Sequence, residues 1–202
     1  STVKRTCTRP LCALLVLLLF LPSCGAGETD TSVIRFSYTC QPYYETKDEL
    51  LHEVDIILVV KVKKTEIIPA FSPGDDPSAL SIGKVERVIK GNLEEGGEIR
   101  MSQNGDNHTI IDTAVEESGG YLQKGQRWLL FLGERNELAQ KVYWDLYHYQ
   151  LPYSIYTMVG QYALDENDHI TFMTDTSRSL LGDIQSVDDM EAIWQEYAAA
   201  NP

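Results

Sequence analysis

The stretch from Leu80 to Met101 predicts a strand, a tight turn and a second strand. Its apolar positions alternate up to Gly83 and then fall at Val85, Val88 and Ile89, so the two-residue period slips. A glycine at such a slip indicates a β-bulge, and bulges bend strands where small barrels turn their corners. The run Lys-Gly-Asn-Leu-Glu-Glu-Gly-Gly supplies the turn. The stretch therefore favours a small β-barrel.

Two further segments predict long buried strands. Val54 to Glu66 has one continuous apolar face and a second face that is apolar only in the middle, at Ile57 and Val59. We expect another part of the chain to cover the centre of that second face. Arg127 to Gly133 is a continuous apolar run bounded by glycines, which predicts a strand buried on both faces.

Helix signals flank these strands. Thr46-Lys47-Asp48-Glu49 has the spacing of a capping box and opens a short helix before the first long strand. Tyr156 to Leu164 and His169 to Met173 predict a hairpin. Ser186 then caps a last helix whose apolar residues recur at spacings of three and four. We expect that amphipathic helix to pack on the barrel.

The chain begins with a basic segment and a short apolar run, Leu11 to Leu21. The run has about half of the roughly 20 residues that a spanning helix needs, so it predicts a secretory signal. It ends in Leu-Pro-Ser-Cys24-Gly, which resembles the lipobox of bacterial lipoproteins. The resemblance implies a signal peptide over 1–23, a diacylglyceryl group on Cys24, a tether over 24–32 and a single domain over 33–202. The alternative is an ordinary cleaved signal with Cys24 in a disulfide.

Cysteines and charge narrow the functions further. Two of the four cysteines lie in the predicted signal, so lipidation of Cys24 leaves Cys40 alone, without a disulfide framework. Cys40 is either a buried structural thiol or a nucleophile paired with His52. Without residues 1–23, 14 basic residues face 30 acidic ones, a formal charge of −16. This charge disfavours nucleic acid as a partner, because phosphates would be repelled.

The order of these segments resembles bacterial secreted proteins that are similar to the OB-fold domain of tissue inhibitors of metalloproteinases and to the netrin module. The resemblance rests on Glu-Val-Asp-Ile-Ile-Leu-Val-Val-Lys-Val, Gly-Lys-Val-Glu-Arg-Val-Ile-Lys-Gly-Asn-Leu and Leu-Gln-Lys-Gly-Gln-Arg-Trp-Leu-Leu-Phe-Leu, and it covers Glu45 to Met173. It implies a mainly β fold, an OB-like five-stranded barrel with a short N-terminal helix and a C-terminal amphipathic helix.

The inhibitors' mechanism does not carry over with the fold. In that family a free N-terminal cysteine within a Cys-x-Cys start chelates the protease zinc. Here Cys24 is followed by Gly25 and Ala26, and a lipidated Cys24 would be held in a bilayer. We also find no nucleophile elbow, phosphate loop, dinucleotide fingerprint or metal-ligand spacing among the histidines, so no cofactor or metal is expected.

An aromatic stretch is the one candidate for ligand contact. OB-folds bind oligomeric ligands on one face of the barrel, and aromatic side chains supply contact area there. The alternative is that Tyr143, Tyr147 and Tyr149 are strand residues that pack beneath the last helix. The candidate ligand-binding residues are Tyr143, Trp144, Tyr147, Tyr149 and Tyr153.

The sequence therefore predicts a non-enzymatic lipoprotein on the extracytoplasmic side of the cell membrane. We expect it to be a binding or adaptor module for a protein or peptide partner. One alternative is a regulator or inhibitor of extracellular proteases that does not use zinc chelation by the N-terminus. Another is a hydrolase that uses Cys40 or a histidine.

Overall fold

The computed structural model describes residues 33–37, 44–68, 76–133, 138, 140–141, 144–145 and 152–202. Cys24 and Cys40 lie outside the described residues, as do the candidate ligand-binding residues Tyr143, Tyr147 and Tyr149. Within the described ranges, no helix combines the length and apolar character needed to cross a bilayer.

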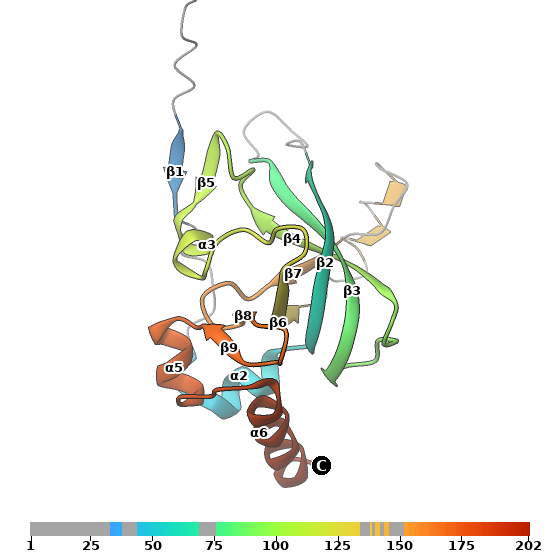
Figure 1. The fold of residues 1–202 in the computed structure, drawn as a ribbon, viewed down its shortest axis with the longest axis vertical. Helices are drawn as coiled ribbons and strands as arrows, with labels where there is room; N and C mark the ends of the chain where they lie inside the picture. Colours follow the sequence, from blue (N-terminus) through green and yellow to red (C-terminus); the bar gives the residue numbers. More distant parts are fainter. Residues whose placement is uncertain are drawn as a thin grey trace, which may run out of the picture. The chain divides into compact units, whose positions relative to one another are not determined.

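Five strands close into a barrel (Figure 1). They are β2 (Ile56–Ile68), β3 (Ser78–Lys90), β4 (Glu98–Asn104), β6 (Arg127–Gly133) and β7 (Tyr153–Ile155). Their order is β2-β3-β4-β7-β6, and β6 pairs again with β2 to close the ring. All pairings in the ring are antiparallel except that of β4 with β7. The predicted mainly β, OB-like five-stranded barrel is confirmed.

Strand β2 divides its side chains between two cores. Ile56, Leu58 and Val60 belong to the cluster that fills the barrel, together with Trp128 and Leu130 of β6. The two intervening residues, Ile57 and Val59, lie on the outer face of the strand and join a second cluster. That cluster also contains residues of α2 (Lys47–Glu53), α5 (Asp175–Leu181) and α6 (Val187–Ala200). The expected cover over the second face of this strand is therefore confirmed, and residues of these helices form part of it.

The pairing of β2 with β3 slips at three places. Two of the extra residues, Glu86 and Ile89, are on β3, and they account for the broken alternation in the sequence. The third, Lys63, is on β2 and faces the step between Ile82 and Gly83. The prediction of bulges in this stretch is correct, but the glycine itself has a different role. Gly83 allows a close approach, because a Cβ there would collide with the Val60 side chain.

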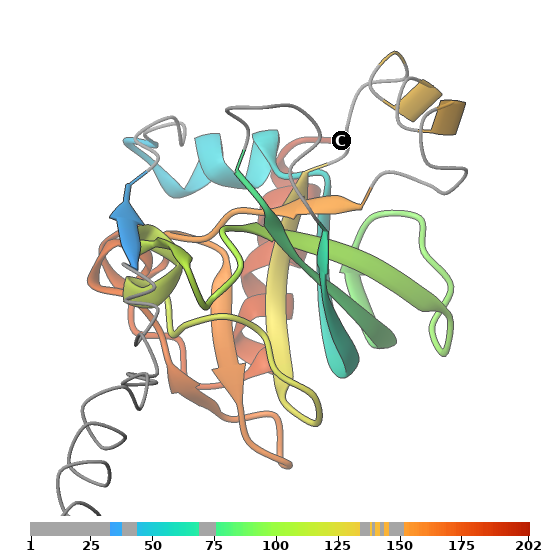
Figure 2. The same cartoon turned by 90° about the horizontal axis from the view of Figure 1, so that it is seen from above.

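Both predicted flanking helices are present, and each begins with a capping box. The Thr46 hydroxyl accepts from the Glu49 amide at 3.2 Å, and the Glu49 carboxylate accepts from the Thr46 amide at 3.3 Å. Ser186 and Asp189 exchange the same pair of bonds at the start of α6. Helix α2 thus precedes the barrel and α6 follows it, and Figure 2 shows α6 behind the barrel strands.

The predicted hairpin is also present, but its first strand is shorter. It consists of β8 (Gln161–Leu164) and β9 (Ile170–Phe172), and β8 pairs with β6. The segment before β8 forms a turn closed by the hydrogen bond from the Gly160 amide to the Tyr156 carbonyl, at 2.7 Å. Helix α5 follows the hairpin and was not predicted.

The remaining elements lie at the end of the barrel away from α2 and α6 (Figure 1). Strand β1 (Ile34–Phe36) pairs in parallel with β5 (Ile110–Asp112), which leads directly into α3 (Thr113–Glu117). Asp112 ends the strand and caps the helix by accepting from the Ala114 amide at 2.9 Å. β2 also ends at this side of the barrel, so the β4–β5 connection and the end of β2 become neighbours.

Candidate binding groove

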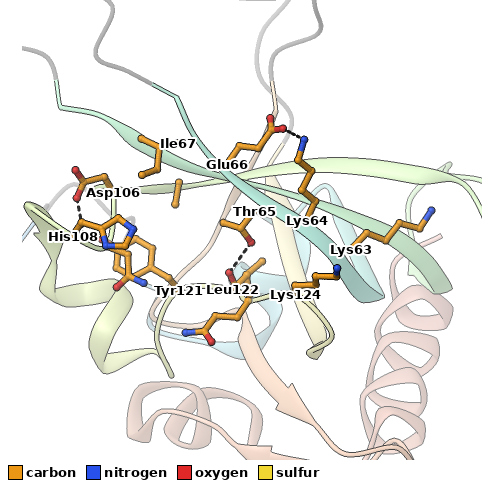
Figure 3. Close-up of a pocket in the computed structure, with 13 residues that line it drawn as sticks. Lys63, Lys64, Thr65, Glu66, Ile67, Asp106, His108, Tyr121, Leu122 and Lys124 are labelled. Atoms are coloured by element: carbon orange, nitrogen blue, oxygen red, sulfur yellow. Dashed lines mark hydrogen bonds and ion pairs between the residues drawn. The ribbon is translucent and has the colours of Figure 1, made fainter.

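A groove of about 750 Å³ lies between the second half of β2 and two connecting segments (Figure 3). One wall is Lys63–Ile67 of β2. The facing residues come from Asp106–His108, in the β4–β5 connection, and from Tyr121–Lys124, in the segment before β6. Thr65 joins the two walls, because its hydroxyl donates to the Leu122 carbonyl at 3.1 Å.

The β4–β5 connection is held in shape by Asp106. One carboxylate oxygen accepts from the amides of His108, Thr109 and Ile110, each at 2.8 Å, and the other accepts from the Thr109 hydroxyl at 2.7 Å. Partial burial opposes ionisation, but these hydrogen bonds outweigh it and lower the pKa of Asp106 to about 2. The carboxylate is thus a fixed anionic anchor of the loop at neutral pH.

Tyr121, on the wall that faces β2, is hydrogen-bonded to residues on both sides of the β4–β5 connection. Its hydroxyl accepts from the Asp112 amide at 2.9 Å and donates to the Asn104 carbonyl at 2.6 Å. Burial raises the pKa of Tyr121 to about 12, so the phenol keeps its proton at neutral pH. Gly105 passes beside this hydroxyl with φ 83°, and a Cβ there would collide with it.

A buried pair of glutamines fixes the segment that carries Tyr121 and Leu122. The Gln103 amide nitrogen donates to the Gln161 side-chain oxygen at 2.9 Å, and the Gln103 oxygen accepts from the Leu122 amide at 2.9 Å. Gln161 donates in turn to the Gly120 carbonyl at 2.6 Å. Polar groups that are buried and bonded in this way hold a single arrangement. The groove is therefore built on a rigid wall.

The β2 wall has an open backbone edge. β2 pairs with β6 only over Ile56–Lys61, whereas its pairing with β3 continues to Ile68. The last backbone bonds on the β6 side join Val62 to Gln126 and Gly125, at 2.9 and 2.8 Å. In the described ranges, Lys63–Ile68 has no backbone partner on the side away from β3.

Lysines surround the groove although the chain has a net charge of −13. Lys63 lies 3.9 Å from Glu98, and Lys64 forms an ion pair with Glu66. Lys124 makes no hydrogen bond or ion pair in the structure as described. In Figure 3, Lys63 and Lys124 lie to one side of Thr65, and Asp106 and His108 lie to the other. The groove thus offers cationic side chains beside apolar ones, such as the 48% exposed Ile67.

The candidate aromatic residues that the structure describes, Trp144 and Tyr153, do not line this groove. Trp144 is 52% exposed. Tyr153 is half-buried on β7, contacts the barrel cluster and lines a separate hollow of about 400 Å³ with Leu93 and Arg100. Neither lines the groove. The nearby Tyr156, which was not a candidate, packs against the second core. The alternative of packing beneath the last helix concerns Tyr143, Tyr147 and Tyr149, which lie outside the described residues.

Sequence reasoning missed the groove because its lining residues come from three separate segments. The lysines of β2 were visible as a polar end of a strand, but an ordinary solvent-exposed strand has the same pattern. Nothing in the sequence indicated that β6 leaves β2 after Lys61. Among the described residues, no group of three or more His, Cys, Asp or Glu is placed to hold a metal ion.

No protein-family model matches the chain, and a search of curated proteins found no similar sequence.

Proposed function

We propose that this protein is a non-enzymatic binding module for a peptide or for a peptide-like segment of a protein partner, and that the groove beside β2 is the binding site. The observation that supports the proposal most directly is a combination found in one groove of about 750 Å³. The groove has a strand edge and a lysine, Lys124, that no described residue pairs with, and it has exposed apolar surface. Pockets of this size with a few convergent polar groups are the usual form of ligand sites.

The proposal also places the domain at the cell envelope. Under it, Cys24 carries the lipid anchor and the acidic domain stands on the extracytoplasmic side of the membrane. Two acyl chains give stable anchoring, at about 0.8 kcal/mol per buried methylene. A Cys24→Ala variant should be released into the medium or remain as uncleaved precursor. Normal processing with continued anchoring would contradict the lipidation.

A selection experiment tests the binding role. Random peptides displayed on phage are selected against the full chain, and the enriched clones are then measured on a Lys124→Glu variant. Lys84→Glu is the matched control, because Lys84 is an exposed lysine of the same sheet that does not line the groove. We expect enriched clones that lose affinity for Lys124→Glu and keep it for Lys84→Glu. Clones that bind both variants equally, or a selection without enrichment, would overturn the proposal.

A further inference from the structure

We propose that the open edge of β2 over Lys63–Ile68 binds an extended acidic peptide as an added strand of the barrel sheet. The inference rests on the proposed function and specifies it: the ligand is an acidic segment in β conformation, and its main chain is recognised as well as its side chains. Recognition of this kind uses backbone hydrogen bonds for affinity and side-chain contacts for specificity.

The geometry of β2 provides the edge. From Lys63 onward, β3 occupies one side of the strand, and β6 has already left the other side after its pairing with Lys61. In a strand, backbone groups of alternate residues point to each side. The stretch Lys63–Ile68 thus presents N–H and C=O groups that no backbone group in the described ranges satisfies. A peptide of six residues would span about 20 Å along it.

The groove provides room beside that edge and limits where the peptide lies. Its far wall is fixed by the Tyr121 hydroxyl and by the buried glutamine pair, so it keeps its distance from β2. The bond from Thr65 to Leu122 joins the two walls. The added strand would lie beside this bond, with side chains of one face against Ile67.

Charge selects an acidic peptide. Lys63 and Lys64 are more than half exposed and meet single carboxylates, while Lys124 meets none that the structure describes. Three lysines and the carboxylates of Glu66 and Asp106 line the groove, whereas acidic residues outnumber basic ones in the whole chain, 30 to 17. This local excess of lysine would steer an acidic ligand to this edge. Lysine on an exposed edge also disfavours pairing between two copies of a chain, which would bring like charges together.

The test uses a fluorescein-labelled octapeptide of alternating Glu and Val, with a Lys-Val octapeptide as the control, titrated against the full chain. We expect the Glu-Val peptide to bind and the Lys-Val peptide to bind at least tenfold more weakly. Each of Lys63→Glu and Lys124→Glu should weaken the Glu-Val peptide by about three- to tenfold, and Lys84→Glu should not. Equal binding of the two peptides would overturn the selection for acid.

Strand addition is tested by methylating the peptide and leaving the protein unchanged. One version carries N-methyl groups on all the valines and another on all the glutamates, so each lacks the N–H donors of one edge. We expect one version to lose at least tenfold in affinity and the other to bind within about twofold of the parent. If both versions bind as well as the parent, strand addition is wrong while the binding role of the groove stands. A dimer that buries this edge without peptide would also overturn it, in favour of a second copy of the chain.

Discussion

The two halves of β2 are parts of one strand with opposite surroundings. Ile56–Lys61 pairs on both edges and contributes to a core on each face. Lys63–Ile68 pairs on one edge, and most of its side chains are exposed. The bulge at Lys63 lies where the halves meet. The difference indicates that the first half stabilises the barrel and that the second half is available for binding.

The largest expected effect compares the same substitution in the two halves. Ile57 is fully buried and Ile67 is 48% exposed. Ile57→Ala should lower the free energy of unfolding by about 2 to 5 kcal/mol, because it leaves a cavity in a packed core. Ile67→Ala should change it by less than about 0.5 kcal/mol. Urea unfolding of the two variants measures both values, and equal losses would remove the distinction between the halves.

The next effect concerns the wall that faces the open half. Gln161→Ala removes the acceptor of the buried Gln103 side-chain amide and one of two donors to the Gly120 carbonyl, which also accepts from Gln103 at 3.3 Å. The loss of these two hydrogen bonds should lower the free energy of unfolding by about 1 to 3 kcal/mol. It should also weaken peptide binding, because the wall loses its support. Gln195→Ala, at an exposed position, serves as the control. If Gln161→Ala lowers the free energy of unfolding no more than Gln195→Ala does, the glutamine pair does not hold the wall.

Tyr121→Phe tests the same wall with one atom removed. The substitution keeps the ring but leaves the buried Asp112 amide without its acceptor. We expect a loss of about 1 to 2 kcal/mol in urea unfolding. Tyr197→Phe, which removes a hydroxyl from the last helix instead, is the matched comparison, since its hydroxyl makes only an exposed contact with His52 at 3.4 Å. No difference between the two variants would contradict the role of the Tyr121 hydroxyl.

A smaller effect should appear as a dependence of stability on pH. The pKa of Asp106 is depressed in the folded state to about 2, from an ordinary value of 3.8. The carboxylate therefore contributes stability that is present above about pH 4 and is lost as the pH falls towards 2. Thermal unfolding between pH 2 and 5 should show a shallower dependence for Asp106→Asn than for the unsubstituted chain. If the melting temperatures of the two proteins depend on pH in the same way, the charge of Asp106 does not stabilise the β4–β5 connection.

The smallest effect on stability is expected at Lys124, one of the lysines that line the groove. Lys124 is exposed and makes no hydrogen bond or ion pair with another described residue. Lys124→Gln should leave the unfolding free energy within about 0.5 kcal/mol but weaken the Glu-Val peptide about two- to fivefold. A stability loss above 1 kcal/mol would assign Lys124 to the fold, and unchanged peptide affinity would remove it from the site.

Local sequence signals predicted those parts of the fold that local physics determines. The capping boxes at Thr46 and Ser186 and the apolar run of β6 appear where the sequence placed them. The bulges lie at Lys63, Glu86 and Ile89, whereas the sequence pattern placed one at Gly83. Register depends on both paired strands, and the pattern of one strand does not determine it. The groove depends on where β6 leaves β2 and on hydrogen bonds between residues far apart, such as Gln103 and Gln161. No spacing within one segment carries that information.

Hydrogen exchange along β2 is the most direct test of the difference between its halves. In the free full chain, amides of Ile56–Lys61 should exchange slowly, and those of Lys63–Ile68 that face the groove should exchange fast. Saturation with the Glu-Val octapeptide should slow the second set at least tenfold and leave the first set unchanged. Equal protection of Lys63–Ile68 and Ile56–Lys61 without peptide would contradict an open edge on β2, and unaltered exchange of Lys63–Ile68 with bound peptide would contradict strand addition there.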